Sequence, residues 1–317
     1  MSRSIEQSES NGFAQKAEEL WLRAVRLYTF YTPIKKGKYR LFQLALKACR
    51  HPHRSLRVDL KDGRKLWVNL TTGMQETVFF HGEFEIPITS IASQIVKTGD
   101  TCIDAGANYG WYTTLFANVV GKAGSVHSFE PVPQTFAELK RNYELLGSPA
   151  NVHINNLAVG DAPGTIVMNL FKDQPTGHAS MAAKEGVETK SVSCELITLD
   201  SYLEKHNVNQ VDFVKVDIEG AELMFLRGAG RLFDQEVPPV ILMEMALAQS
   251  KYFGYTPNDL LTFLSEKAEY DFYAVDEIGG KLVPIKAFEP DNIGANVFCI
   301  PRNAAERTIS IVSKYTN

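Results

Sequence analysis

From residue 88 onward, short runs of β-branched and other apolar residues alternate with longer segments whose apolar residues recur at helical spacing. The short runs predict buried strands at residues 101–105, 126–129, 152–157, 211–216 and 240–243. Strands that alternate with helices pair mainly in parallel, and the helices cover both faces of the sheet. The sequence therefore predicts an α/β fold, with a doubly wound, Rossmann-like sheet in the last two-thirds of the chain.

The first 87 residues lack this alternation. Residues 1–11 are polar and are expected to be disordered, whereas residues 12–31 and 39–49 have the apolar spacing of helices. In residues 55–70, apolar and polar residues alternate on both sides of an Asp-Gly turn, which is typical of a β-hairpin. The two helices are expected to pack either on the main domain or on a second copy of the protein, as a homo-oligomer.

The loop after the first predicted strand is rich in glycine and begins with an acid. It contains Asp104, Gly106, Asn108 and Gly110. Ligands of open α/β sheets bind beyond the carboxyl ends of the strands, and glycine lets the backbone turn sharply there. The spacing G-x-x-x-G differs from the G-x-G-x-x-G of dinucleotide sites. The acid would repel a diphosphate and suit an ammonium group, which favours S-adenosylmethionine over NAD.

The loops after the second and third predicted strands complete the expected cofactor site. Glu130 and Pro131 follow the second strand, and a carboxylate there can accept hydrogen bonds from a ribose diol. Asn156, Leu157 and Ala158 follow the third strand. Apolar contacts and a backbone amide in this loop are expected to hold an adenine ring.

The loop after the fourth predicted strand carries two carboxylates, Asp217 and Glu219. They are expected to hold a substrate hydroxyl, to remove its proton, or to bind a divalent cation such as magnesium. The alternative is that one of them only caps the next helix. Glu244 closes the fifth strand and is a candidate metal ligand with Asp217, or a positioning group. His178, in the polar insertion 172–189, is the alternative base, or else a solvated loop histidine.

Taken together, these segments resemble the FkbM-type methyltransferases. The resemblance lies within about residues 80–245 and is carried by the segments T-C-I-D-A-G-A-N-Y-G-W-Y, F-E-P, N-L-A-V-G-D, L-D-S-Y-L, V-K-V-D-I-E-G-A-E and I-L-M-E. It implies a class I fold that binds S-adenosylmethionine and transfers a methyl group, usually to a hydroxyl oxygen. Sugars, glycolipids and polyketide-type natural products are the acceptors that it implies.

The same resemblance implies a further site residue and a division of the chain. The family's G-x-Y-E element is matched by Gly82-Glu-Phe84-Glu85, with Phe in place of Tyr, and Glu85 becomes a candidate cofactor-binding residue. The implied division is an N-terminal helical extension at 1–54, a hairpin and connector at 55–87, and an S-adenosylmethionine-dependent methyltransferase domain at 88–317.

Charge is unevenly distributed along the chain. Between Lys35 and Lys65 there are eleven Lys and Arg residues and two acids, a charge of +9, whereas the whole chain carries −4 and the remainder therefore −13. Such asymmetry marks an anionic partner, for example peripheral contact with anionic lipid or a lipid-linked substrate, or else a dispersed, solvated basic face.

The sequence also bears on the cellular compartment. No apolar run reaches the ~20 residues of a membrane span. Four cysteines lie far apart without a C-x-x-C pair, which argues against zinc or dithiol chemistry and favours a reducing, cytoplasmic location.

Two other functions compete with a small-molecule or glycan O-methyltransferase. A nucleic-acid methyltransferase would use the basic stretch, but the chain is acidic overall and has no N-P-P-Y or D-P-P-Y segment after the fourth strand. A cofactor-binding pseudo-enzyme would act through partners, and the acids at Asp104, Glu130 and Asp217 argue against it.

Overall fold

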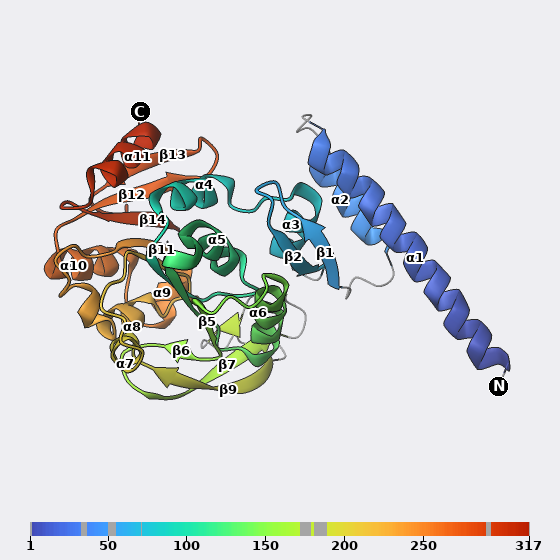
Figure 1. Ribbon diagram of the computed structural model, residues 1–317, viewed down its shortest axis with the longest axis horizontal. Helices are drawn as coiled ribbons and strands as arrows, with labels where there is room; N and C mark the ends of the chain where they lie inside the picture. Colours follow the sequence, from blue (N-terminus) through green and yellow to red (C-terminus); the bar gives the residue numbers. More distant parts are fainter. Residues whose placement is uncertain are drawn as a thin grey trace. The chain divides into compact units, whose positions relative to one another are not determined.

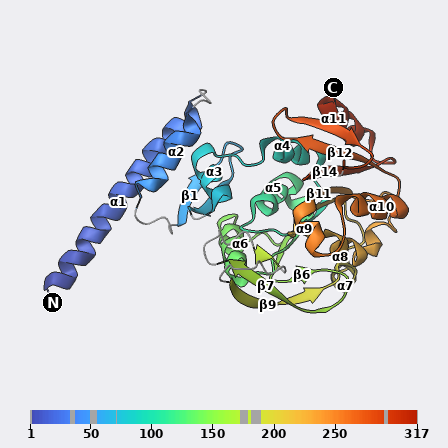
Figure 2. The ribbon, with the colours of Figure 1, turned by 180° about the vertical axis from the view of Figure 1, so that it is seen from behind.

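The computed structural model describes residues 2–32, 37–49, 55–70, 72–171, 179–180, 189–289 and 293–316. The chain forms two compact units, Met1–Phe84 and Glu85–Asn317. Figures 1 and 2 show the elements from opposite sides, with helices and a hairpin in the smaller unit and a helix-covered sheet in the larger one.

The larger unit is built on an eight-stranded sheet with the order β13-β12-β14-β11-β10-β3-β4-β5. The strands are β3 (Thr101–Ala105), β4 (Ser125–Phe129), β5 (Val152–Asn155), β10 (Phe213–Val216), β11 (Val240–Ala246), β12 (Tyr270–Asp276), β13 (Lys281–Ile285) and β14 (Gly294–Pro301). Strands β11, β10, β3, β4 and β5 pair in parallel, and β14 is antiparallel to both of its neighbours. Strand order reverses between β3 and β10, where open α/β sheets bind their ligands.

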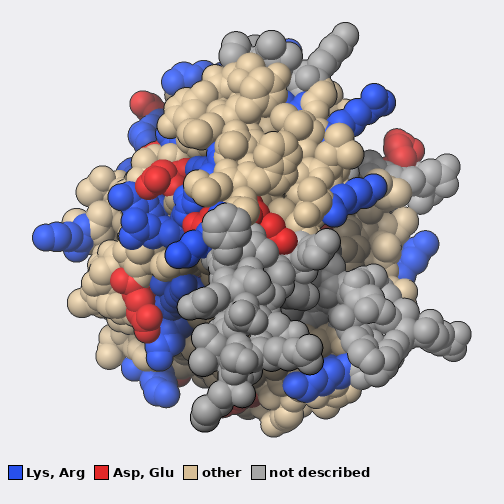
Figure 3. All heavy atoms as spheres, turned by 90° about the vertical axis from the view of Figure 1, so that its right-hand side faces the viewer, with Lys and Arg blue, Asp and Glu red and all other residues tan. Residues whose placement is uncertain are grey.

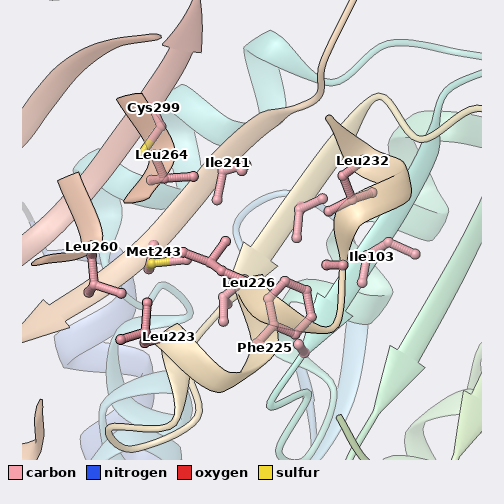
Figure 4. Close-up of a cluster of buried hydrophobic side chains, with 14 of the residues drawn as sticks. Ile103, Leu223, Phe225, Leu226, Leu232, Ile241, Met243, Leu260, Leu264 and Cys299 are labelled. Atoms are coloured by element: carbon pink, nitrogen blue, oxygen red, sulfur yellow. The ribbon is translucent and has the colours of Figure 1, made fainter. Parts of the chain in front are cut away.

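Helices cover both faces of this sheet. They are α4 (Ile86–Ile95), α5 (Trp111–Val120), α6 (Pro133–Leu145), α7 (Leu199–Lys205), α8 (Glu222–Arg227), α9 (Leu247–Tyr252), α10 (Pro257–Lys267) and α11 (Glu306–Thr316). On one face, Ile103 belongs to a buried cluster with Phe225 of α8 and Leu264 of α10 (Figure 4). On the other face, Phe213 lies 5.3 Å from Phe116 of α5, between ring centroids. Because strand side chains alternate between faces, the doubly wound prediction is confirmed.

A second sheet in the larger unit was not predicted. Its order is β6-β9-β7-β8, with β6 (Ala158–Val159), β7 (Gly164–Phe171), β8 (Ala179–Ser180) and β9 (Thr189–Ile197). Strands β7 and β9 pair antiparallel and flank the polar insertion. Val132, Met168 and Cys194 form a small separate core beneath them.

The smaller unit contains α1 (Ser2–Tyr31), α2 (Lys38–Lys47), β1 (Ser55–Asp59), β2 (Lys65–Asn69) and α3 (Gly73–His81). The predicted hairpin is confirmed, because β1 and β2 pair antiparallel with Leu56 opposite Val68. Residues 2–11, which were expected to be disordered, belong to helix α1, which begins at Ser2. Polarity does not end a helix, and these residues include no proline. Among the described helices, none has both the length and the apolar content of a membrane span.

Several of the basic side chains between residues 35 and 65 are paired within the smaller unit. The ion pairs join Lys61 with Glu83, Arg64 with Asp62, and Lys65 with Asp59. On the face drawn in Figure 3, Lys and Arg side chains are scattered, with Asp and Glu side chains between several of them. In the described part of the stretch, three of the basic side chains are thus already paired with acids of the same unit.

Candidate active site

The loops after β3 and β10 approach each other at Gly106. Its backbone has φ +81°, and a Cβ added there would lie 1.8 Å from the carbonyl oxygen of Asp217. The backbone N–H groups of Gly106 and Ala107 both donate to the carbonyl oxygen of Phe129, at 3.0 and 2.9 Å. Only glycine fits this position, and the contact holds the carboxyl ends of β3, β4 and β10 together.

Asp104 is the buried acid at the centre of the sheet. In register it lies between Ser128 of β4 and Lys215 of β10, so the three side chains share one face. Thr113 of α5 donates to Asp104 Oδ2 at 2.6 Å, and its Oγ1 lies 2.9 Å from the Oγ of Ser128. Asp104 is fully buried, and within the described structure its Oδ1 accepts no hydrogen bond. The structure thus turns this side chain toward α5, with one oxygen unsatisfied.

Lys215 supplies positive charge to the site and is itself buried. Its Nζ lies 2.9 Å from Asp217 Oδ2 and 5.0 Å from the ring centroid of Tyr112. The Tyr112 hydroxyl donates to Glu85 Oε2 at 2.6 Å. Burial alone would lower the pKa of Lys215, but Asp217, Asp104 and Glu85 raise it above the usual lysine value. Lys215 is therefore a permanent cation that links the acids of three elements.

Glu244 extends the group of carboxylates onto β11. Burial raises its pKa to about 9, and the charges of Asp217, Glu219 and Glu222 add to this effect while Lys215 opposes it. Like charges held close together cannot all ionise, which favours the protonated form of Glu244.

The predicted divalent cation has no support from the described residues. Among the residues that the structure describes, no group of three or more His, Cys, Asp or Glu side chains could hold a metal ion. We therefore assign no step of the chemistry to a metal.

Glu222 stabilises the turn that carries Asp217 and Glu219. The Glu222 carboxylate accepts hydrogen bonds from the backbone N–H groups of Ile218 and Gly220, at 3.2 and 3.1 Å, and from the Tyr255 hydroxyl at 2.9 Å. Glu219 has φ +57° and Gly220 has φ +103°. A left-handed non-glycine residue is strained, and such strain concentrates at functional sites.

The residue at the N-cap of α8 is Ala221, which is neither of the paired acids and makes no side-chain capping hydrogen bond. Glu222, which the sequence interpretation left without a role, makes the local backbone bonds instead.

Glu130 joins the loops after β3 and β4. Its two carboxylate oxygens accept hydrogen bonds from the backbone N–H groups of Asn108 and Val132, both at 3.0 Å. Burial raises its pKa to about 7. The amide of Asn156 donates to the carbonyl oxygens of Glu130 and Pro131, at 2.8 and 2.9 Å, and so ties the loop after β5 to the same place. Three predicted cofactor loops therefore meet, although each Glu130 oxygen already has a backbone partner.

The remaining candidates lie around this centre or outside the described residues. Gly110 precedes α5 with φ +96°, and a Cβ there would lie 2.8 Å from a Leu139 methyl carbon. Leu157 packs against the large buried cluster, and Ala158 is buried in β6. His178, the alternative base, lies outside the described residues.

Sequence reasoning missed the side chains that organise these acids, namely Lys215, Tyr112, Glu222 and Tyr255. Lys215 sits inside the V-K-V-D-I-E-G-A-E segment, where a lysine in an apolar strand is the available signal. Its role follows only from the pairing of β10 with β3, which no local pattern encodes.

A doubly wound sheet whose acidic and glycine-containing loops converge where strand order reverses defines a class I methyltransferase fold. Comparison with known proteins narrows this class. A family model described as "Methyltransferase FkbM domain" matches residues 104–272, more than half of the chain, and the chain belongs to this family.

Individual relatives are distant. The chain is 28% identical over 144 residues to Methyltransferase 1 of Beauveria bassiana. This alignment covers 40% of this chain and 57% of that protein. It is also 28% identical over 167 residues to the hexuronic acid methyltransferase AglP of Haloferax volcanii, covering 53% of this chain and 62% of AglP. The chain thus spans about three-fifths of the length of these curated relatives. A crystal structure of methyltransferase FkbM from Methylobacillus flagellatus aligns with 63% of this chain and 43% of its own, at 17% identity and a TM-score of 0.39.

Proposed function

We propose that the protein is an S-adenosylmethionine-dependent O-methyltransferase that acts on a hydroxyl group of a sugar, glycolipid or natural product. The observation that carries this proposal is the cluster of acids around Lys215 at the point where strand order reverses. Family membership supports the reaction class. The acceptor and the oxygen nucleophile are inferences from the chemistry of the cluster.

The residues at the carboxyl ends of β3 and β4 fit the proposed cofactor. Asp104 has a buried carboxylate oxygen without a hydrogen-bond partner in the described structure, which suits a cationic amino-acid group. Gly106 lets the loops after β3 and β10 meet, because a side chain there would collide with the carbonyl oxygen of Asp217. The unshared lone pairs of Glu130 suit a ribose diol. When bound here, S-adenosylmethionine would supply a methyl group on a sulfonium.

Asp217, Glu219 and Glu244 differ in what they can do for an acceptor hydroxyl. Lys215 already engages Asp217, which makes Asp217 a positioning group. Glu244 in its protonated form can donate a hydrogen bond. Glu219 sits at the strained turn beside both. We assign Glu219 as the base that would take the hydroxyl proton. The methyl group would pass from the donor sulfur to the acceptor oxygen, with S-adenosylhomocysteine as the leaving product.

Charge disfavours a nucleic-acid acceptor. The larger unit, which holds the site, has 18 Lys and Arg residues against 29 Asp and Glu, a net charge of −11. A surface of that sign repels a polyanion. The name of the Haloferax relative, a hexuronic acid methyltransferase, agrees with a sugar acceptor.

The proposal predicts the behaviour of Glu219→Gln in an assay with labelled donor. With a panel of sugar and polyketide hydroxyl acceptors, the variant is expected to lose roughly 100-fold or more in kcat, because general base catalysis contributes about 10²–10⁴-fold. Its affinity for S-adenosylhomocysteine should be unchanged. Glu195→Gln, an exposed change on β9, is the matched control and should keep full activity.

Two outcomes would contradict this assignment. Full activity in Glu219→Gln would remove Glu219 from the reaction. Label transferred to RNA or DNA, and to none of the hydroxyl acceptors, would replace the proposed acceptor class.

A further inference from the structure

Helix α1 has an exposed stripe of apolar residues with a regular spacing. Its members lie three and four residues apart in alternation, and we call them the α1 seam: Ala17, Leu20, Ala24, Leu27 and Tyr31. This is the spacing of the a and d positions of a coiled coil. All five are exposed, and the exposed fraction is 70% for Leu20, 60% for Leu27 and 74% for Tyr31.

The α1 seam is not the face that attaches α1 to its own unit. That attachment uses Leu22, Val25 and Thr29, which are buried. Thr29 also donates to the carbonyl oxygen of Phe80 on α3. A helix that is apolar on two faces requires a partner on each of them. Within the smaller unit, no other described helix or strand covers the α1 seam, although the ring of Tyr31 contacts the neighbouring ring of Phe30.

We propose that two copies of this chain pair through the α1 seam as a parallel two-stranded coiled coil. With Ala17, Ala24 and Tyr31 at a positions and Leu20 and Leu27 at d positions, the pattern covers two heptads. This inference concerns an association surface and does not depend on the proposed activity.

The residues that flank the α1 seam favour the parallel orientation. The g positions hold Lys16 and Arg23, and the e positions hold Trp21 and Tyr28. In a parallel pair, each g residue faces the e residue of the next heptad on the other helix. Each cation then lies against an aromatic ring, an attractive contact. In an antiparallel pair, g faces g, and the cations repel. The Arg23–Glu19 ion pair is exposed and weak enough to rearrange.

The size of the surface and the charge of the helix favour a second copy over a membrane. Two sets of seam and flanking side chains offer on the order of 1,000 Å² of apolar area, close to the ~1,200 Å² at which stable interfaces begin. Helix α1 has four basic and four acidic residues. It therefore has no net charge to attract it to anionic lipid.

Sedimentation velocity of the full chain tests this inference. A concentration-dependent dimer is expected. Leu20→Glu and Leu27→Glu should each raise its dissociation constant roughly 100-fold or more, because a charge would be buried in an apolar seam. Leu44→Glu on α2, where the leucine is 64% exposed but outside the seam, is the matched control and should leave the dimer intact. Circular dichroism should show all three variants folded.

Cross-linking tests the orientation. In a Cys49→Ser background, Leu20→Cys and Leu27→Cys should each form a disulfide-linked dimer in air, because a parallel pair brings both positions opposite themselves. An antiparallel pair can do this for at most one of them, which would overturn the orientation.

Three results would overturn the pairing itself. The first is a protein that stays monomeric at all concentrations when its cysteines are blocked with maleimide. This would place the α1 seam against another part of the same chain. The second is a monomer that floats with phosphatidylglycerol vesicles, which would make the seam a membrane surface. The third is a dimer that survives both glutamate substitutions, which would locate the interface elsewhere.

Discussion

Lys215 shows how a single buried side chain balances the charge of the candidate site. It is 6% exposed, lies opposite Asp104 in the sheet and forms an ion pair with Asp217. A buried charge is tolerated only when it is paired, and removal of one partner leaves the other uncompensated. The acids at the ends of β3 and β10 therefore depend on this lysine for stability as well as for any role in binding.

Lys215→Met is expected to lower the free energy of unfolding by about 3 kcal/mol, because Asp104 loses the charge opposite it in a buried environment. Urea denaturation measures this change. Lys205→Met, at the exposed end of α7, is the control and should stay within about 0.5 kcal/mol of the parent. A Lys215→Met protein as stable as the parent would show that the buried acids are balanced in another way.

Because the pKa of Glu244 is raised in the folded protein, we expect the free energy of unfolding to depend on pH. Its carboxyl has a pKa of about 4.3 when unfolded and of about 9 in the folded protein. Between these values the folded state binds more protons, so the stability that the protonated carboxyl contributes is lost as pH rises. Glu244→Gln has a neutral amide in place of the carboxyl, so this position does not titrate in the variant.

Urea denaturation at several pH values compares the two proteins. The parent should lose stability relative to Glu244→Gln from about pH 5 up to about pH 9. Glu204→Gln, an exposed change on α7, should run parallel to the parent. A constant difference between parent and Glu244→Gln across this range would mean that the carboxyl titrates normally.

At the scale of elements, the site depends on close contact between the loops after β3 and β10. Gly106→Ala would place a methyl group on the Asp217 carbonyl oxygen and hold alanine at φ +81°. The left-handed conformation alone costs about 1–2 kcal/mol, so a loss of at least that size is expected in thermal or urea denaturation, with weaker binding of S-adenosylhomocysteine. Gly164→Ala on β7 meets no atom within 4 Å and should have little effect. Equal effects of the two substitutions would contradict the close contact.

Elements with regular periodicity were predicted well. Strand β3 and helix α5 have the expected bounds because a buried apolar run and a helical apolar stripe are strong local signals. Helix α3 was missed because Val78, Phe79 and Phe80 are consecutive and all buried, which erases the helical period. Strands β7 and β9 were missed because their sheet has only a small core, so their apolar alternation is weak.

Across the whole molecule, the sequence indicated where the acids and glycines would gather but not how they are joined. The convergence of loops follows from strand order, which the alternation of strands and helices implies. The links from Lys215 to Asp104, from Glu222 to Tyr255 and from Asn156 to Glu130 join different elements. Such pairs become visible only when the register of the sheet is known.

The most direct test of the account is calorimetric titration of the full chain with S-adenosylhomocysteine and, separately, with NAD. We infer that a methionine-derived cofactor binds beside Asp104, where the carboxyl end of β3 and the loop after β10 meet. We expect a saturable heat with S-adenosylhomocysteine, weakened in Gly106→Ala, and none with NAD. Saturable binding of NAD, with no heat from S-adenosylhomocysteine, would contradict it.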